Sequence, residues 1–240
     1  MNVIITGASK GIGKAIAEIF AANGHHLFLC ARGELALYKT VEELTTRYPD
    51  TTIKAKPVDL GKKEEAIAFG NWCLSFAVPE ILVNNAGLFE PGSVYNEPDG
   101  LLENQVAVNL YSAYHVTRTL LPKMMERPSE AAGSPGRGHV FNMCSVASLH
   151  AYENGGAYSV SKYALHGFSK NLREEMKPFN IKVTSVFPGA VLTDSWGNFD
   201  NRKQRIMEAD DIAKMIYAAT QLSPAACVED IVIRPQLGDL

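Results

Sequence analysis

The chain has 240 residues, of which 46% are hydrophobic and 20% charged, a composition typical of a globular protein that buries its own core. Its formal net charge of -3 disfavours nucleic acid as a partner, because phosphate backbones attract basic surfaces, and no apolar run is long enough to span a membrane. Four scattered cysteines without a CxxC pair, and no cluster with metal-ligand spacing, predict reduced thiols, no bound metal and a cytoplasmic location.

Apolar runs that predict strands alternate along the chain with segments of helical periodicity. The first strand, Val3–Thr6, starts so early that we expect no signal peptide before it. Further strands are expected at His26–Ala31, Thr52–Asp59, Ile81–Asn84, His139–Ser145, Lys182–Phe187 and Cys227–Arg234. Helices are expected around 12–20 and 37–48 and at Leu102–Met125, Gly155–Lys177 and Asp210–Leu222.

Strands that are separated by helices pair in parallel through crossover connections. The pattern therefore predicts an α/β fold, a doubly wound seven-stranded parallel sheet of Rossmann type with helices on both faces. No linker interrupts the pattern, so we expect one domain over residues 1–240. Two stretches are irregular, the Pro-, Gly- and Ser-rich 127–138, which is expected to be a surface loop, and 190–208.

Three glycines follow the first strand in the stretch TGASKGIG, residues 6–13. Between a strand and an amphipathic helix, such a turn predicts a dinucleotide site. Glycine permits positive φ and lets a pyrophosphate approach the backbone, where the N–H groups of the helix N-terminus attract anions. A tight turn without a ligand is the alternative. The residues assigned to the cofactor here are Gly7, Ser9, Lys10, Gly11, Ile12 and Gly13.

A second group of residues suits acid–base chemistry. Tyr158 and Lys162 lie one turn apart on a predicted helix, and Ser145 ends a strand thirteen residues before the tyrosine. The ammonium group is expected to lower the pKa of Tyr158 from about 10, and the serine hydroxyl to hydrogen-bond a substrate carbonyl. Each residue alone would be ordinary surface or strand-end structure. Together, behind a dinucleotide turn, they favour catalysis.

The chain resembles the short-chain dehydrogenase/reductase family in a series of motifs over roughly residues 1–195. These are TGASKGIG, NNAG at 84–87, Asn109, Ser145, Tyr158-x-x-x-Lys162 and Pro188-Gly189-x-x-x-Thr193. The resemblance implies that Asn109 bends its helix and holds a water linked to Lys162, completing a catalytic set with Ser145 and Tyr158. It also implies that Lys162 hydrogen-bonds the nicotinamide ribose. A homodimer or homotetramer through helices near 101–126 and 155–178 is implied as well.

Nucleotide preference is predicted from the end of the second strand, where no carboxylate is placed to bind a ribose hydroxyl. Arg32 lies there instead, and Arg32 with Lys10 suits a 2′-phosphate; two solvated surface cations are the alternative. We therefore predict NADP(H) over NAD(H). By resemblance, further cofactor contacts are Asp59, Leu60, Asn85, Ala86, Gly87, Tyr158, Lys162, Pro188, Gly189, Val191 and Thr193, whereas Asn84 is expected to brace the central strand.

The family resemblance implies a substrate lid at about 190–209. Its aromatic residues, with others nearby, suit a planar or apolar ketone, and packing against the body of the protein is the alternative. The expected pocket residues are Phe89, Leu149, Tyr152, Trp196 and Phe199. The C-terminal third, with PGAVLTDSWG and VEDIVIRPQLGDL, resembles bacterial sepiapterin-reductase-type members, which hold a pterin with a carboxylate. Asp239 is the candidate for that role, or else a solvated terminal acid.

The predicted function is that of an NADPH-dependent carbonyl reductase with a small-molecule substrate. It would transfer hydride between NADP(H) and a ketone or secondary alcohol, with a sepiapterin-like compound or a diketone as the expected substrate type. A 3-oxoacyl-thioester reductase is the alternative among enzymes. A cofactor-binding regulator or scaffold with little turnover is the alternative of another class, and the complete four-residue set argues against it.

Overall fold

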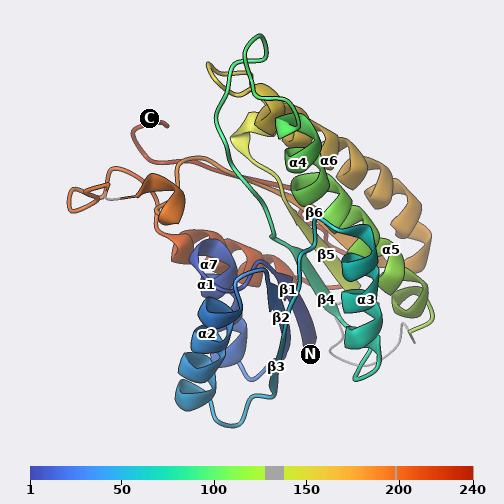
Figure 1. The fold of residues 1–240 in the computed structure, drawn as a ribbon. Helices are drawn as coiled ribbons and strands as arrows, with labels where there is room; N and C mark the ends of the chain where they lie inside the picture. Colours follow the sequence, from blue (N-terminus) through green and yellow to red (C-terminus); the bar gives the residue numbers. More distant parts are fainter. Residues whose placement is uncertain (128–137, 198, 240) are drawn as a thin grey trace.

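A computed structural model of the chain describes residues 1–127, 138–197 and 199–239. Seven parallel strands form one sheet in the order β3-β2-β1-β4-β5-β6-β7, which confirms the predicted doubly wound fold of Rossmann type (Figure 1). The strands are β1 (Asn2–Thr6), β2 (His26–Ala31), β3 (Ile53–Pro57), β4 (Ile81–Asn84), β5 (Gly138–Met143), β6 (Ile181–Pro188) and β7 (Asp230–Ile233). The loop predicted at 127–138 falls, apart from its two end residues, outside the described residues.

Helices cover both faces of the sheet (Figure 1). One face carries α1 (Gly11–Ala22), α2 (Glu34–Arg47) and α7 (Ala209–Thr220), and the other carries α3 (Lys63–Leu74), α4 (Leu101–Val106), α5 (Ser112–Met125) and α6 (Gly156–Met176). Helix α3 is not among the predicted helices, because apolar residues outside its buried face weaken the helical pattern in the sequence. Within the described residues, no helix has the length and apolar character that crossing a membrane requires.

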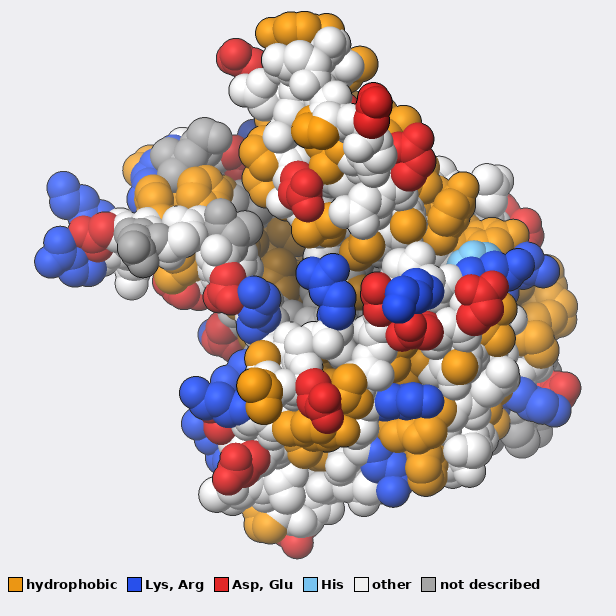
Figure 2. All heavy atoms as spheres, viewed as in Figure 1, with side chains coloured by type: hydrophobic (Ala, Val, Ile, Leu, Met, Phe, Trp, Pro, Cys, Tyr) orange, Lys and Arg blue, Asp and Glu red, His pale blue; other side chains and the backbone are white. Residues whose placement is uncertain are grey.

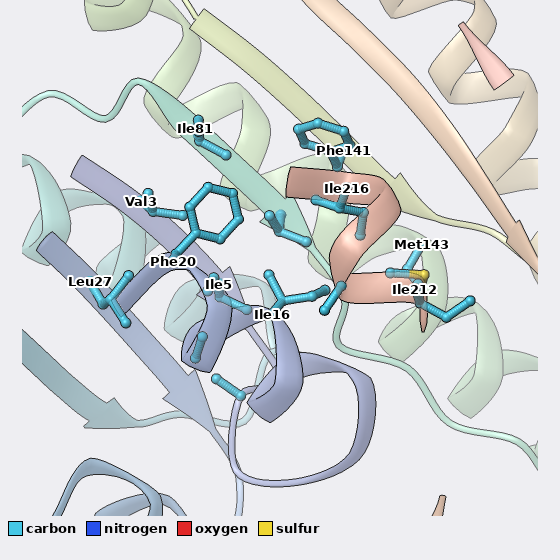
Figure 3. Close-up of a cluster of buried hydrophobic side chains, with 14 of the residues drawn as sticks. Val3, Ile5, Ile16, Phe20, Leu27, Ile81, Phe141, Met143, Ile212 and Ile216 are labelled. Atoms are coloured by element: carbon cyan, nitrogen blue, oxygen red, sulfur yellow. The ribbon is translucent and has the colours of Figure 1, made fainter. Parts of the chain in front are cut away.

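Both faces of the sheet are buried under these helices. Val3 and Ile5 of β1 point into the cluster beneath α1 and α7, while Ile4 points into the cluster beneath α3 and α5. Figure 3 shows the first cluster, where Phe20 of α1 and Ile216 of α7 meet the strand residues. Each such side chain contributes about 1.5–3 kcal/mol when fully buried. Because the strands are parallel, the core fixes their carboxyl ends along the same side of the sheet, called here the carboxyl edge.

Several predicted strands begin or end elsewhere than expected. Strand β5 stops at Met143 because the N–H of Cys144 bonds to the Asn142 carbonyl and leaves the ladder. Strand β7 begins at Asp230 rather than Cys227, since the carbonyl of Val228 accepts a side-chain hydroxyl instead of a ladder N–H. The predicted strand at Thr52–Asp59 is likewise shortened to β3. These shifts matter most at Ser145, which lies beyond β5.

Candidate active site

The glycine turn joins β1 to α1 at the carboxyl edge of the sheet. Gly7 and Gly11 have φ of 67° and 54°, in the left-handed region that favours glycine. Gly13 is needed for a different reason, because an ideal Cβ there would collide with the carbonyl oxygen of Gly7. Helix α1 has Lys10 as its N-cap without a side-chain cap, and its first turn holds no acidic residue. Its N-terminal N–H groups therefore fit a pyrophosphate.

The residues after β4 brace this turn. The hydroxyl oxygen of Thr6 accepts the backbone N–H groups of Asn85 and Ala86, both at 2.9 Å. The side-chain amide of Asn85 donates to the carbonyls of Thr6 and Gly7 at 3.0 and 3.1 Å. The Asn85 side chain is therefore committed to the glycine turn.

Tyr158 and Lys162 lie one turn apart on α6, with Lys162 Nζ 5.7 Å from the centroid of the tyrosine ring. Burial lowers the pKa of Lys162 to about 8, and its Nζ donates to the Met143 carbonyl at 2.8 Å. Burial raises the pKa of Tyr158 to about 12, and a hydrogen bond with the Ser145 side chain acts in the opposite direction. The expected lowering of the Tyr158 pKa is therefore wrong for this structure, because desolvation of the phenolate dominates.

Ser145 lies two residues beyond the end of β5, not within the strand as predicted. It caps the short 3₁₀ helix Val146–Ser148, where its Oγ accepts the N–H of Ala147 at 3.1 Å. Its own N–H donates to the Ser148 hydroxyl at 3.2 Å. This reciprocal cap fixes the serine rotamer, so that its hydroxyl reaches Tyr158.

Asn109 lies in a single π-helical turn, Ala107–Tyr111, between α4 and α5. The predicted local bend is therefore present, and such turns are frequent at functional sites. Its Oδ1 accepts the N–H of Leu88 at 2.7 Å, and its Nδ2 donates to the Ser161 hydroxyl at 2.8 Å. An ideal Cβ on Gly87 would lie 3.3 Å from Asn109 Oδ1 and 3.4 Å from Lys162 Nζ. The asparagine and the lysine thus border the same backbone position.

The start of α6 is held from a distant part of the chain. Glu97 Oε1 accepts the N–H of Ala157 at 2.8 Å, across 60 residues of sequence, one residue before Tyr158. Gly156 has φ of 25°, and a Cβ there would collide with this carboxylate. The carboxylate also complements the positive end of the helix. Sequence reasoning missed Glu97, because no local pattern connects it to α6.

Of the five predicted pocket residues, two lie near Tyr158 and three make packing contacts elsewhere. Phe89 meets the Tyr158 ring edge-to-face, with centroids 4.8 Å apart. Tyr152 is near enough to raise the pKa of Tyr158 electrostatically. Leu149 packs against a small buried cluster beside α6, and Trp196 and Phe199 pack on each other at 5.3 Å. Figure 2 shows a hollow between the segment 190–209 and the chain that follows β4, with hydrophobic side chains on its floor and charged side chains at its rim.

The two cations assigned to the 2′-phosphate differ in their surroundings. Arg32 is exposed just beyond β2. Lys10 is exposed as well but is paired, since its Nζ lies 2.7 Å from the carboxylate of Asp194, in the short 3₁₀ helix Asp194–Trp196. About two-thirds of each side chain in this pair is exposed, so the pair is weak. A phosphate can therefore compete for Lys10.

The remaining predicted cofactor residues lie along the same edge. Pro188 ends β6, and a Cβ on Gly11 would lie 3.2 Å from the Thr193 methyl group. Asp59 accepts the N–H of Gly61 at 3.2 Å. The side chains of Leu60 and Val191 are buried in the core clusters, whereas that of Ile12 packs against one of them and stays partly exposed.

Asp239 is not a solvated terminal acid. Its side chain is 22% exposed and pairs with Arg234, and it also binds the backbone N–H of Ala190.

Within residues 1–127, 138–197 and 199–239, no three His, Cys, Asp or Glu side chains are grouped so as to hold a metal ion.

Comparison with known proteins identifies the family and the fold of this chain. The family model for the short chain dehydrogenase matches residues 1–204. A sepiapterin reductase from Chlorobaculum tepidum is 31% identical over 247 residues, covering 99% of this chain and 97% of its own. A metagenomic short-chain oxidoreductase solved in complex with NADP is 26% identical, with a TM-score of 0.82 and coverage of 98% and 97% of the two chains. An alcohol dehydrogenase from Thermococcus sibiricus complexed with 5-hydroxy-NADP has a TM-score of 0.86 at 24% identity, covering 98% and 96% of the two chains, and shows the fold alone.

Proposed function

The chain belongs to the short-chain dehydrogenase family of oxidoreductases, and on that premise we propose that it is an NADPH-dependent carbonyl reductase acting on a ketone or secondary alcohol. One observation carries the proposal. The fold gathers Ser145, Tyr158, Lys162 and Asn109 beside a glycine turn whose helix N-terminus fits a pyrophosphate. The relative solved in complex with NADP supports nucleotide binding.

The proposed chemistry assigns one task to each side chain. The nicotinamide, when bound, supplies the hydride to the carbonyl carbon. Ser145 hydrogen-bonds the carbonyl oxygen and stabilises the charge that develops there. Tyr158 is protonated at neutral pH, because burial raises its pKa to about 12, and it donates that proton to the oxygen. Since an alkoxide is more basic than a phenolate, this transfer is downhill.

Lys162 and Asn109 support the proton supply in this proposal. With a pKa lowered to about 8 by burial, Lys162 can release a proton far more readily than an exposed lysine. Asn109 fixes the backbone at Leu88 and the hydroxyl of Ser161 on the neighbouring helix. It therefore holds the two sides of the site at a constant separation.

The proposed function is tested by titrating the purified protein with NADPH and NADH by fluorescence. The loss of NADPH absorbance is then followed with sepiapterin, diketones and acetoacetyl thioesters. Tight NADPH binding with turnover of one class supports the reductase and names its substrate type. Turnover of the thioester alone supports the 3-oxoacyl-thioester reductase, and tight binding without any turnover supports a cofactor-binding regulator.

Exchanging both Arg32 and Lys10 for alanine is expected to weaken NADPH binding by about tenfold or more, with little change for NADH. The reason is that each charge-assisted hydrogen bond to a phosphate contributes about 1.5–3 kcal/mol, and only NADPH carries the 2′-phosphate. Fluorescence titration of both nucleotides measures the difference. Lys123→Ala is the control, since this exposed lysine lies at the C-terminal end of α5, away from the carboxyl edge. Equal losses of affinity for NADPH and NADH would show that Arg32 and Lys10 do not bind the 2′-phosphate.

Trp196→Ala is expected to raise the substrate KM about threefold to tenfold and to leave NADPH affinity nearly unchanged. An aromatic contact adds about 0.5–1.5 kcal/mol, and Trp196 packs on Phe199 in the proposed lid. Steady-state kinetics with the best substrate provide the measurement, and Phe76→Ala, an exposed aromatic after α3, is the control. An unchanged KM would assign Trp196 to the packing of the lid.

We also propose that the chain forms a homodimer or homotetramer through α4, α5 and α6. Tyr111, in the π-helical turn between α4 and α5, is 51% exposed, and Val160 and Tyr163 on α6 are 50% and 46% exposed. A groove of about 450 Å³ lies on the same face, lined by Lys63, Leu110, Tyr111, Tyr114, His115, Ala164 and Phe168. Exposed apolar surface of this kind suits a partner. The molecular mass in solution, from sedimentation equilibrium, decides the oligomeric state.

A further inference from the structure

Both carboxylate oxygens of Asp239 are engaged by the protein itself. Oδ1 accepts the backbone N–H of Ala190 at 2.8 Å, and Oδ2 accepts the Nε–H of Arg234 at 2.6 Å. Arg234 directly follows β7, and Ala190 lies two residues after β6. The side chain near the end of the chain therefore bridges the ends of two neighbouring strands.

The backbone around Asp239 is held from a third direction. Arg205, in the segment 190–209, donates from Nη1 to the carbonyl of Gly238 at 2.8 Å and from Nη2 to the carbonyl of Asp239 at 3.4 Å. Gly238 has φ of 82°, and its N–H bonds to the Pro235 carbonyl. The C-terminal tail, residues 235–239, is therefore folded back and tied to the far end of the proposed lid.

Gly189 shows how closely the tail approaches the turn after β6. An ideal Cβ at this position would collide with Oδ1 of Asp239 and lie 3.0 Å from its Cγ. The N–H of Gly189 meanwhile bonds to the Ile233 carbonyl of β7 at 2.8 Å. Only glycine leaves room for the carboxylate here. The conformation of Gly189 and Ala190 is therefore coupled to the tail.

We propose that Asp239 is a positioning residue, which holds the Gly189–Ala190 turn and the segment 190–209 in the arrangement that binds the nicotinamide end of the cofactor. This inference rests on the proposed function, because it takes that turn to lie beside the nicotinamide. It also assigns Asp239 a role other than direct substrate contact, since N–H groups of the protein itself already bind both carboxylate oxygens.

Asp239→Ala is expected to weaken NADPH binding about fivefold to tenfold and to lower kcat, because loss of the Ala190 hydrogen bond releases the turn. Asp239→Asn keeps an acceptor for the Ala190 N–H and is expected to recover most of both losses. Glu229→Ala is the matched control. This carboxylate, just before β7, also pairs with an arginine, Arg173, but lies at the opposite end of the strand.

A second measurement is independent of turnover. Amide hydrogen exchange of peptides covering 186–197 should accelerate about fivefold or more in Asp239→Ala and stay near the wild-type rate in Asp239→Asn. If Asp239→Ala changes neither NADPH affinity nor exchange, the inference is overturned. It is also overturned if only the substrate KM rises, which would make Asp239 a substrate contact. If the wild type neither binds NADPH nor reduces a carbonyl, the proposed function fails, while the exchange rates still decide whether Asp239 holds the turn.

Discussion

Tyr158→Phe is expected to lower kcat by about 10²–10⁴-fold, the range that a positioned general acid contributes. The substitution removes one hydroxyl and leaves the ring, its edge-to-face contact with Phe89 and its place on α6. Ser145 keeps its cap on Ala147, so the serine rotamer is retained. The carbonyl would then still bind and be polarised by Ser145, but the general acid that protonates its oxygen would be missing.

Steady-state kinetics and an NADPH titration separate this effect from a loss of binding. The affinity for NADPH should stay within about twofold of the wild type, because a general acid acts mainly in the transition state. Tyr163→Phe is the matched control, since Tyr163 lies on the same helix and is 46% exposed. Turnover of Tyr158→Phe at the rate of the control would exclude Tyr158 as the acid.

The sheet could be predicted because buried parallel strands read as short apolar runs. Alternation of such runs with amphipathic helices leaves few possible topologies. The bracing role expected of Asn84 is also observed, since its amide donates to Thr117 and Asn142 at 2.9 and 2.8 Å. Helix α3 buries Ala66, Phe69 and Cys73 on one face, but further apolar residues such as Trp72 and Leu74 lie around the rest of the cylinder. A pattern of period 3.6 is therefore weak there, and the helix was missed.

For the candidate site, the sequence indicates which residues to consider but not the partners that position them. The contacts that position it join residues that are distant in sequence: Asn109 with Ser161, Glu97 with Ala157, Lys10 with Asp194 and Asp239 with Ala190. The periodicity of a local sequence indicates which face of a helix or strand a residue lies on. It does not indicate which distant segment of the chain packs against that face. Exposed Lys10, for example, has the same sequence context whether it meets a phosphate or a carboxylate.

The pKa of Tyr158 likewise could not be predicted from the local sequence. From the sequence, the lysine one turn away is the only visible influence, and it would lower that pKa. In the folded chain Tyr158 is half-buried, and Lys162 donates to the Met143 carbonyl. Desolvation is set by every segment that covers the site, so burial decides the direction of the shift.

Gly13→Ala is expected to lower the free energy of unfolding by about 1–3 kcal/mol, the usual effect of overpacking a filled site. An ideal Cβ at Gly13 would collide with the Gly7 carbonyl and lie 2.5 Å from Asn85 Nδ2. Helix propensity acts in the opposite direction, since alanine is favoured over glycine in a helix by about 0.8–1.0 kcal/mol. The sign of the measured change therefore reports which influence is larger at this position.

Gly167→Ala in α6 is the matched control, because no heavy atom outside its own helix turn lies within 4 Å of the added Cβ. It should raise the free energy of unfolding by about 0.5–1 kcal/mol, and urea unfolding of both variants measures the contrast. The Gly13 variant should also weaken NADPH binding by about tenfold or more, because α1 must move away from Gly7 and its N–H groups then leave the pyrophosphate. Since one displacement causes both effects, stability and affinity should fall together. A variant that loses stability but binds NADPH normally would separate the glycine turn from the cofactor site.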